Sequence, residues 1–446
     1  MNEGADMERS SLLGGVWDKI DASGPSLRER GRVQEVTGLI VRATVPGASV
    51  GELVEIDPRG APKRLAEVVG FCGRDAILMP LGEVRGVGPD AAVETTGRAL
   101  ELRCGPALLG RVLDGLGRPI DGGPALKGRG IERWPLMRPA PDPFRRKRIG
   151  EAMSMGIRAI DGLLTVGRGQ RVGLFAGSGV GKSTLMGQIA RGSEAEVVVI
   201  SLIGERGREV REFIEEVLGE EGMKRAVVVV ATSDAPSLIR LKSAFVATAI
   251  AEYFRAQRKE VLLMMDSVTR FARAQREVGL AAGEPPARQG YPPSVFSMLP
   301  RLLERTGNDA EGSITALYTV LVAGGDMEEP IADEVRGILD GHIILSRELA
   351  SRGHWPAIDI LPSLSRVMGD VVSASHGEAA KRFRDILATY EAHRDLIRLG
   401  AYEYGNDYEV DLAIDYIEEL EEFLQQGLTE RTPIKETVER MLDLFG

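Results

Sequence analysis

The chain has 446 residues, of which 43% are hydrophobic and 27% are charged, and its formal net charge is −10 at pH 7. This composition supplies apolar side chains for more than one hydrophobic core and excludes a disordered scaffold. The negative charge disfavours non-specific nucleic-acid binding, and four histidines and two cysteines without close spacing argue against a zinc cluster.

The sequence predicts a cytoplasmic protein. Apolar runs such as AVVVVA at 226–231 are far shorter than the ~20 residues that a membrane helix needs. The opening residues, MNEGADMERSS, lack the basic and apolar regions of a secretory signal. With Cys72 and Cys104 as the two cysteines, we expect a reducing compartment and no structural disulfide.

Residues 1–28 are polar and charged, and the spacing of Leu12, Leu13, Val16 and Ile20 is typical of a short amphipathic helix. Two interpretations are open for this segment. It is either a frayed terminus or a docking segment for a partner or a membrane surface.

Residues 29–100 contain short β-type runs separated by glycine and proline, a pattern that predicts a small N-terminal β-barrel. Residues 101–150 form a connector rich in glycine and proline, including GRVLDGLGRPIDGG. Because proline blocks a regular helix, we expect this connector to be an ordered crossing between domains.

Apolar strands alternate with amphipathic segments between residues 151 and 374, which predicts an α/β domain with a parallel sheet covered on both faces. The six predicted strands are 171–175, 197–203, 226–232, 261–265, 314–322 and 342–346. Residues 375–446 are acidic and have helical spacing, so we expect a separate C-terminal helical domain.

A glycine-rich turn, AGSGVGKST at 176–184, follows the first of these strands and precedes a helix that begins near Lys182. Glycines let backbone N–H groups close around phosphate oxygens, and the helix N-terminus adds its dipole. Lys182 can reach the β and γ phosphates and Ser183 can ligate Mg²⁺, although Ala176 replaces the usual first glycine. The predicted nucleotide-binding residues are Gly177, Ser178, Gly179, Val180, Gly181, Lys182, Ser183 and Thr184.

Two carboxylates follow predicted strands. Asp266 ends the apolar run VLLMMD, which places it at the carboxyl edge of the sheet, where it can support Mg²⁺. Glu205 follows the strand 197–203, and hydrolysis needs a base that deprotonates water. From the residues alone, Glu205 is either that base or a stabiliser of the helix that begins there.

Long motifs support a more specific interpretation. They read AGSGVGKS, IGERGREVREF, MMDSVTRFARAQREVGLAAGEPPARQGYPPSVFSMLPRLLER and HWPAIDILPSLSRVM. Together they resemble the ATPase of type III protein export, in flagellar export and the related injectisome, which is itself similar to the catalytic subunits of rotary ATP synthases. The resemblance covers nearly all of the chain from about residue 31 and implies a RecA-like P-loop ATPase core.

The resemblance also implies a homohexameric ring with ATP sites between neighbouring subunits. Lys182 and Ser183 are then expected to bind phosphate and Mg²⁺, Asp266 to support the metal and Glu205 to activate the water. Arg206 is expected to lie near the γ-phosphate.

Three further residues have alternative interpretations. Arg366, in LSRVM, matches an arginine finger that reaches the neighbour's site, and the alternative is a surface ion pair. Trp355 stands where the family usually has a tyrosine that packs against adenine, and the alternative is a core aromatic. Arg270 either senses the nucleotide state or is structural.

For function, the resemblance implies that ATP turnover releases export cargo from chaperones and engages the export gate at the cytoplasmic face of the inner membrane. It also implies a coiled-coil central stalk and a peripheral regulator at the N-terminal segment. The acidic segment 403–411 either contacts a basic stalk or is a solvated surface.

Several rival functions remain. We expect flagellar rather than injectisome export, because no feature of the sequence demands the latter. A rotary ATP synthase catalytic subunit shares the fold, but GERGREV and DSVTRFARAQRE favour the export family. The negative charge disfavours an RNA-translocating ATPase and a nucleic-acid partner, and Lys182, Glu205 and Asp266 together disfavour a ring component without hydrolysis.

Overall fold

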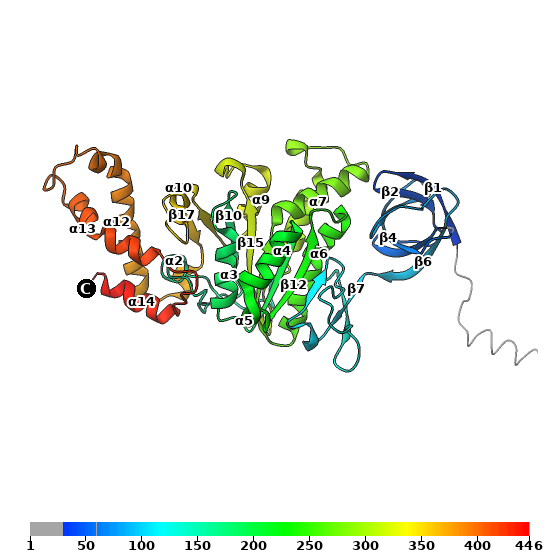
Figure 1. Ribbon diagram of the computed structural model, residues 1–446, viewed down its shortest axis with the longest axis horizontal. Coiled ribbons are helices and arrows are strands. Elements are labelled where there is room, and N and C mark those ends of the chain that lie inside the picture. Colours follow the sequence, from blue (N-terminus) through cyan, green and yellow to red (C-terminus); the bar gives the residue numbers. More distant parts are fainter. Residues whose placement is uncertain (1–29, 59, 446) are drawn as a thin grey trace, which may run out of the picture. The chain divides into compact units, whose positions relative to one another are not determined.

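The computed structural model of the chain describes residues 30–58 and 60–445 (Figure 1). Contacts divide the chain into two compact units, one ending at Leu100 and the other beginning at Glu101. The predicted docking segment 1–28 lies outside the described residues. Among the helices that the structure describes, none is both long and apolar enough to cross a membrane.

The first unit is a closed antiparallel barrel with the strand order β1-β2-β5-β4-β3-β6, closed by pairing of β1 with β6. Alternate residues such as Val33, Val41, Val54 and Ile56 point inward and are almost fully buried, as the period of a β-strand requires. The predicted N-terminal barrel is therefore confirmed. Its strands are β1 (Arg30–Thr37), β2 (Ile40–Thr44), β3 (Glu52–Asp57), β4 (Arg64–Cys72), β5 (Asp75–Pro80) and β6 (Ala92–Ala99).

The second unit is built on a sheet with the strand order β17-β16-β10-β15-β13-β11-β12-β8, in which β17 and the short β14 are antiparallel to their neighbours. The other pairings are parallel, which confirms the predicted α/β core. These strands are β8 (Val112–Asp114), β10 (Arg171–Ala176), β11 (Val197–Glu205), β12 (Ala226–Thr232), β13 (Glu260–Asp266), β14 (Gly307–Asn308), β15 (Ser313–Leu321), β16 (Gly341–Leu345) and β17 (Ile358–Ser365).

The predicted connector contributes to this sheet. Its strand β8 pairs in parallel with β12, with Leu113 opposite Val229, and so forms one edge of the sheet. A second pair, β7 (Glu101–Cys104) with β9 (Glu132–Pro135), lies outside the main sheet. The sequence pattern predicted a crossing because a three-residue strand between glycines and prolines carries almost no periodic signal.

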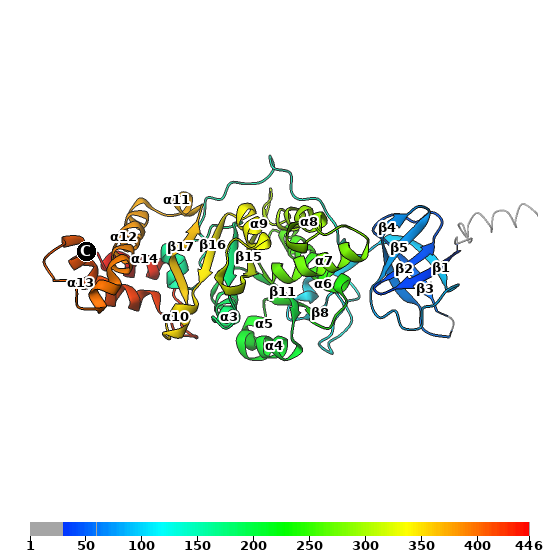
Figure 2. The ribbon, with the colours of Figure 1, turned by 90° about the horizontal axis from the view of Figure 1, so that it is seen from above.

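Helices cover both faces of the sheet. Figure 2 shows α3, α4 and α5 along one side of the sheet and α8 and α9 along the other. The helices of this region are α2 (Arg158–Leu163), α3 (Lys182–Gly192), α4 (Gly207–Glu212), α5 (Gly219–Met223), α6 (Ser237–Ala256), α7 (Val268–Ala281), α8 (Pro293–Leu303), α9 (Pro330–Ile338) and α10 (Arg347–Ser351), with a π-helical turn at Phe213–Leu218.

The C-terminal helices share one core with the sheet. Ile200 of β11, Leu185 of α3 and Phe423 near the C-terminus all belong to a single cluster of buried apolar residues. The segment predicted as a separate helical domain, 375–446, is thus continuous in its packing with the nucleotide-binding core. Its helices are α12 (Ala374–Arg398), α13 (Tyr408–Leu424) and α14 (Ile434–Asp443), preceded by the short α11 (Met368–Val371) (Figure 1).

One buried ion pair joins α6 to the segment that follows α8. Arg305 donates from Nε and Nη2 to the two carboxylate oxygens of Glu252 at 2.8 and 2.6 Å, and the two side chains are 1% and 2% exposed. Removing one member of such a pair leaves an uncompensated buried charge.

We therefore predict that Glu252→Gln lowers the free energy of unfolding of the second unit by about 3–5 kcal/mol. Glu311→Gln is a matched control, because Glu311 pairs with Arg258 at 2.7 Å where both side chains are exposed. Urea denaturation followed by circular dichroism measures both changes. Equal effects of the two substitutions would contradict the assignment of Glu252 to a stabilising buried pair.

Candidate active site

The predicted phosphate loop joins β10 to α3. Gly179 and Gly181 both have a φ of 78°, in the left-handed region where a side chain is strained. Helix α3 begins at Lys182 and has no side-chain cap at its N-terminus. Its first N–H groups are therefore available to an anion, and the helix dipole favours negative charge at the same point.

The loop residues differ in their surroundings. Ser178, Gly179 and Ser183 are exposed, whereas Val180 is 2% exposed and, with Thr184, lines a cavity beside the loop. The Ser183 hydroxyl is thus accessible at the start of α3. The backbone of the loop, rather than its side chains, offers most of the polar groups.

Lys182 forms an ion pair with Asp266, the last residue of β13. Asp266 is 3% exposed and also accepts a hydrogen bond from Thr319 Oγ1 of β15 at 2.8 Å. Sequence reasoning predicted Lys182 and Asp266 but missed Thr319. The run 314–322 also contains the hydroxyls of Thr315 and Tyr318, so no local signal singles out Thr319. Together these contacts hold a buried carboxylate at the carboxyl edge of the sheet.

Glu205 ends β11, whose residue Leu202 lies opposite Asp266 in the parallel pairing with β13. Arg270 of α7 donates from Nη2 to Glu205 Oε2 at 3.2 Å. Burial raises the pKa of Glu205 to about 7; the charge of Asp266 adds to the rise, and the charges of Lys182 and Arg270 oppose it. A carboxylate with such a pKa exchanges protons near neutral pH, as a general base must.

The donor set at this edge suits Mg²⁺. The carboxylate of Asp266 and the hydroxyl of Ser183 are hard oxygen ligands, and Mg²⁺ commonly takes one or two protein ligands together with substrate phosphates. No group of three or more His, Cys, Asp or Glu side chains within residues 30–58 and 60–445 could hold a metal ion by itself. These residues therefore fit a metal that arrives with a phosphate ligand.

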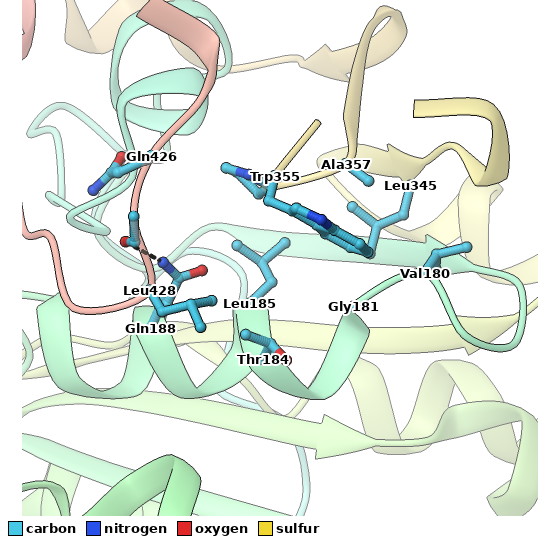
Figure 3. Close-up of a pocket in the computed structure, with 12 residues that line it drawn as sticks. Val180, Gly181, Thr184, Leu185, Gln188, Leu345, Trp355, Ala357, Gln426 and Leu428 are labelled. Carbon is cyan, nitrogen blue, oxygen red and sulfur yellow. Dashed lines mark hydrogen bonds between the residues drawn. The ribbon is translucent and has the colours of Figure 1, made fainter. Parts of the chain in front are cut away.

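Trp355 lies against the phosphate loop and borders a cavity of about 380 Å³ (Figure 3). A Cβ placed on Gly181 would come within 2.5 Å of the Trp355 ring, so the ring packs directly on that glycine. Trp355 is 39% exposed, which disagrees with a core aromatic and leaves ring surface available for stacking. Apolar Leu185 and Leu345 line the same cavity.

The segment that follows α13 closes this cavity. Gln426, Gly427 and Leu428 line it, and the N–H of Gln426 donates to the carbonyl of Trp355 at 2.8 Å. Sequence reasoning missed this wall. No local pattern marks QQGL as part of a site, because the contact joins segments about 70 residues apart through the shared core.

The charged cluster at the sheet edge consists of Lys182, Asp266, Glu205 and Arg270. Neither Arg206 nor Arg366 is paired with a member of this cluster. Arg206 has a 75% exposed side chain that pairs with Glu209 at 3.4 Å. Arg366 follows β17, and its N–H and Nη2 donate to the carbonyls of Asp340 and Arg336.

Register places Arg366 at the opposite edge of the sheet from the phosphate loop. Ser365 lies opposite Gly341, at the start of β16, whereas the loop follows the end of β10. A six-residue strand at 3.3 Å per residue separates these edges by roughly 20 Å. Arg366 therefore cannot reach the phosphate loop of its own chain.

Family comparisons agree with this geometry. Residues 156–365 match the ATP synthase alpha/beta family, nucleotide-binding domain, and residues 33–97 match the β-barrel domain of the same family. Residues 372–443 match the T3SS EscN ATPase C-terminal domain, which favours the export branch over rotary synthase subunits.

Individual relatives are similar over nearly their whole length. The flagellum-specific ATP synthase of Bacillus subtilis is 52% identical over 94% of this chain and 96% of its own, and the type 3 secretion system ATPase of Xanthomonas euvesicatoria is 54% identical over 92% and 93%. The solved structure of the assembled ATPase EscN from enteropathogenic E. coli has a TM-score of 0.88 and 47% identity, covering 93% of this chain and all of that one.

The barrel, the phosphate loop, the paired charges at the sheet edge and the matches along the chain lead to one assignment: the chain belongs to the ATP synthase alpha/beta family, in its branch of flagellar and type III secretion ATPases.

Proposed function

We propose that the chain hydrolyses Mg·ATP at interfaces between copies in a homohexameric ring, and that turnover serves type III protein export. The observation that supports this most strongly is the buried pairing of Lys182 with Asp266 beside Glu205, below the uncapped N-terminus of α3. The flagellar relative and the type III secretion relative have similar sequence identity to this chain, 52% and 54%. Between the two systems, we propose the flagellar one for this chain.

In the proposed reaction, the loop N–H groups from Gly177 to Thr184 bind the phosphates and Lys182 turns from Asp266 toward the β and γ phosphates. A bound Mg²⁺ would be held by Ser183 and Asp266 together with phosphate oxygens, and it would supply positive charge there. The ring of Trp355 stacks on the base.

Glu205 accepts the proton of the attacking water. Arg270 is a positioning residue, because its hydrogen bond at 3.2 Å orients the Glu205 carboxylate and opposes the rise of its pKa. We propose that Arg206, which is exposed on the same edge, approaches the γ-phosphate once nucleotide binds.

Arg366 is proposed to act on the γ-phosphate of the neighbouring subunit. It is exposed and lies at the far edge of its own sheet, so a catalytic role requires a second chain. A guanidinium supplied in this way stabilises charge that develops in the transition state. Catalysis would then depend on assembly of the ring.

Partners are proposed from relatives and from the surface. The EscN ATPase has been solved in complex with its central stalk EscO, with a TM-score of 0.86 to this chain. The loop between α12 and α13 and the first residue of α13 expose Leu399, Tyr404 and Tyr408 around the acidic segment 403–411, which suits a basic coiled-coil stalk. We further propose a regulator at residues 1–28 and engagement of chaperones, cargo and the export gate at the inner membrane.

We predict that Glu205→Gln preserves ATP binding and lowers kcat by about 10²–10⁴, because the amide cannot take a proton from water. Calorimetric titration with ATP and a phosphate-release assay measure the two effects. Glu212→Gln is the matched control on the adjacent helix, because Glu212 lies in an exposed pair with Arg208, and it should retain most turnover. Full hydrolysis by Glu205→Gln would place the base elsewhere.

The same variant tests export. In a deletion strain, a wild-type copy should restore flagella and secreted flagellar proteins, whereas the Glu205→Gln copy should restore them less well. Normal flagella in the deletion strain, with loss of injectisome secretion instead, would reverse the choice of system.

We predict that kcat/KM falls as the pH drops through about 7, because Glu205 is protonated below its raised pKa and can no longer accept a proton. Arg270→Gln removes a positive charge that favours the carboxylate, so this limb should move to higher pH by about one unit. Ionisation of ATP is the same in both proteins and cancels from the difference.

Arg208→Gln, in the exposed pair with Glu212, serves as the control and should leave the limb in place. If the acidic limb of the pH profile of kcat/KM lies at the same pH in the wild type and in Arg270→Gln, Glu205 is not the titrating base.

We predict that Arg366→Ala retains ATP binding and lowers kcat by about 10³ or more. Mixing it with Glu205→Gln subunits should restore activity, because roughly a quarter of the interfaces in a random closed ring then combine an intact base with an intact finger. Mixing it with the double variant Glu205→Gln/Arg366→Ala should restore none. Absence of recovery in rings shown to be mixed would contradict action across the interface.

A further inference from the structure

The cavity beside Trp355 ends in two glutamine side chains, Gln188 of α3 and Gln426 of the segment after α13 (Figure 3). The rest of its lining is largely apolar, including Leu185, Leu345 and Leu428. A nucleobase in this cavity would therefore find its hydrogen-bond partners at the glutamine end. Each of the two glutamines is 5% exposed. The hydrogen bonds of each amide therefore show whether it has a polar atom left for a ligand.

Gln426 is fully engaged within the protein. Its Nε2 donates to the carbonyls of Gly156 at 2.8 Å and Glu430 at 3.1 Å. Its Oε1 accepts from the N–H of Arg158 at 2.8 Å. This amide ties the wall of the cavity to α2 and has no donor left for a ligand.

Gln188 is engaged at one end. Its Nε2 donates to the carbonyl of Gly427 at 3.0 Å, and a carbonyl only accepts, so the amide orientation is fixed. The Oε1 is consequently turned toward the cavity, away from Gly427 (Figure 3). Across the part of the chain that the structure describes, no donor is hydrogen-bonded to this oxygen.

The position of Gln188 matches the far end of a bound base. Lys182 and Gln188 are six residues apart on α3, which is about 9 Å along the helix axis. A nucleotide with its phosphates at the N-terminus of α3 and its base against Trp355 would extend along α3 toward Gln188. In a purine nucleotide the six-membered ring, with its 6-substituent, lies farther from the sugar than the five-membered ring.

We propose that Gln188 selects the base: its Oε1 accepts a hydrogen bond from the 6-amino group of adenine and opposes the 6-oxygen of guanine or hypoxanthine. This inference rests on the proposed nucleotide site and adds to it the residue that distinguishes ATP from other purine nucleotides. A fixed acceptor discriminates well because the wrong base leaves two acceptors facing each other without a proton between them.

Calorimetric titration of the full chain with Mg²⁺ and three nucleotides tests the proposal in the Glu205→Gln background, which prevents turnover. ATP carries a 6-amino group, purine riboside triphosphate carries hydrogen at that position, and inosine triphosphate carries oxygen. We expect ATP to bind about tenfold more tightly than inosine triphosphate, with purine riboside triphosphate between them.

Gln188→Met keeps the length of the side chain and removes the acceptor. In this variant ATP should bind only as tightly as purine riboside triphosphate, and the three affinities should agree within about twofold. Leu428→Ala is the matched control, because Leu428 lines the same cavity without a polar atom; it should weaken all three nucleotides alike and keep their ratio.

The outcomes separate the two proposals. Binding of none of the nucleotides would overturn the nucleotide site itself. Equal affinities for all three nucleotides in the unsubstituted cavity would overturn base selection by Gln188 and leave the nucleotide site standing. An unchanged ratio of the three affinities in Gln188→Met would do the same. The comparison of three nucleotides needs no substitution in the cavity, so equal affinities would overturn the proposal even if Gln188→Met does not fold.

Discussion

The pairing of Lys182 with Asp266 at the carboxyl edge of the sheet is the interaction on which the rest of the site depends. A carboxylate that is 3% exposed is costly to bury unless a cation and hydrogen-bond donors compensate its charge. Lys182 and Thr319 provide that compensation, and Arg270 does the same for Glu205. Two cations, each paired with a carboxylate, thus form a cluster before any nucleotide arrives.

These pairings bear on the proposed role of a second chain. A nucleotide brings net negative charge even with its metal, and the cations of the cluster are already paired with carboxylates. Arg366 is an exposed cation outside the cluster, and the strand β17 carries it to the opposite edge of its own sheet. A ring in which that edge meets the phosphate loop of a neighbour would supply the missing charge at the reacting phosphate.

Sequence reasoning was most reliable where a local pattern fixes a position in the fold. The ends of apolar runs predicted Asp266 and Glu205 at one edge, because the carboxyl ends of neighbouring parallel strands coincide. The glycine-rich loop predicted the start of α3 at Lys182 for a similar reason: its geometry is set within a few residues.

The remaining features depend on contacts between distant segments, which spacing does not encode. The strand β8 joins the sheet from within the connector, and Gln426 reaches Trp355 because the C-terminal helices share the core of the sheet. The sequence left open whether Arg270 senses the nucleotide state or is structural, and in the structure Arg270 donates to Glu205. Each of these contacts adds a support or a wall to a site whose charged centre was predictable.

The most direct test is a structure of the assembled ring with Mg²⁺ and a non-hydrolysable ATP analogue. The account predicts that Lys182 Nζ leaves Asp266 for the phosphates and that Arg366 of the adjacent subunit lies about 3 Å from the γ-phosphate. An analogue bound wholly within one chain, with every Arg366 still on the carbonyl of Arg336, would contradict it.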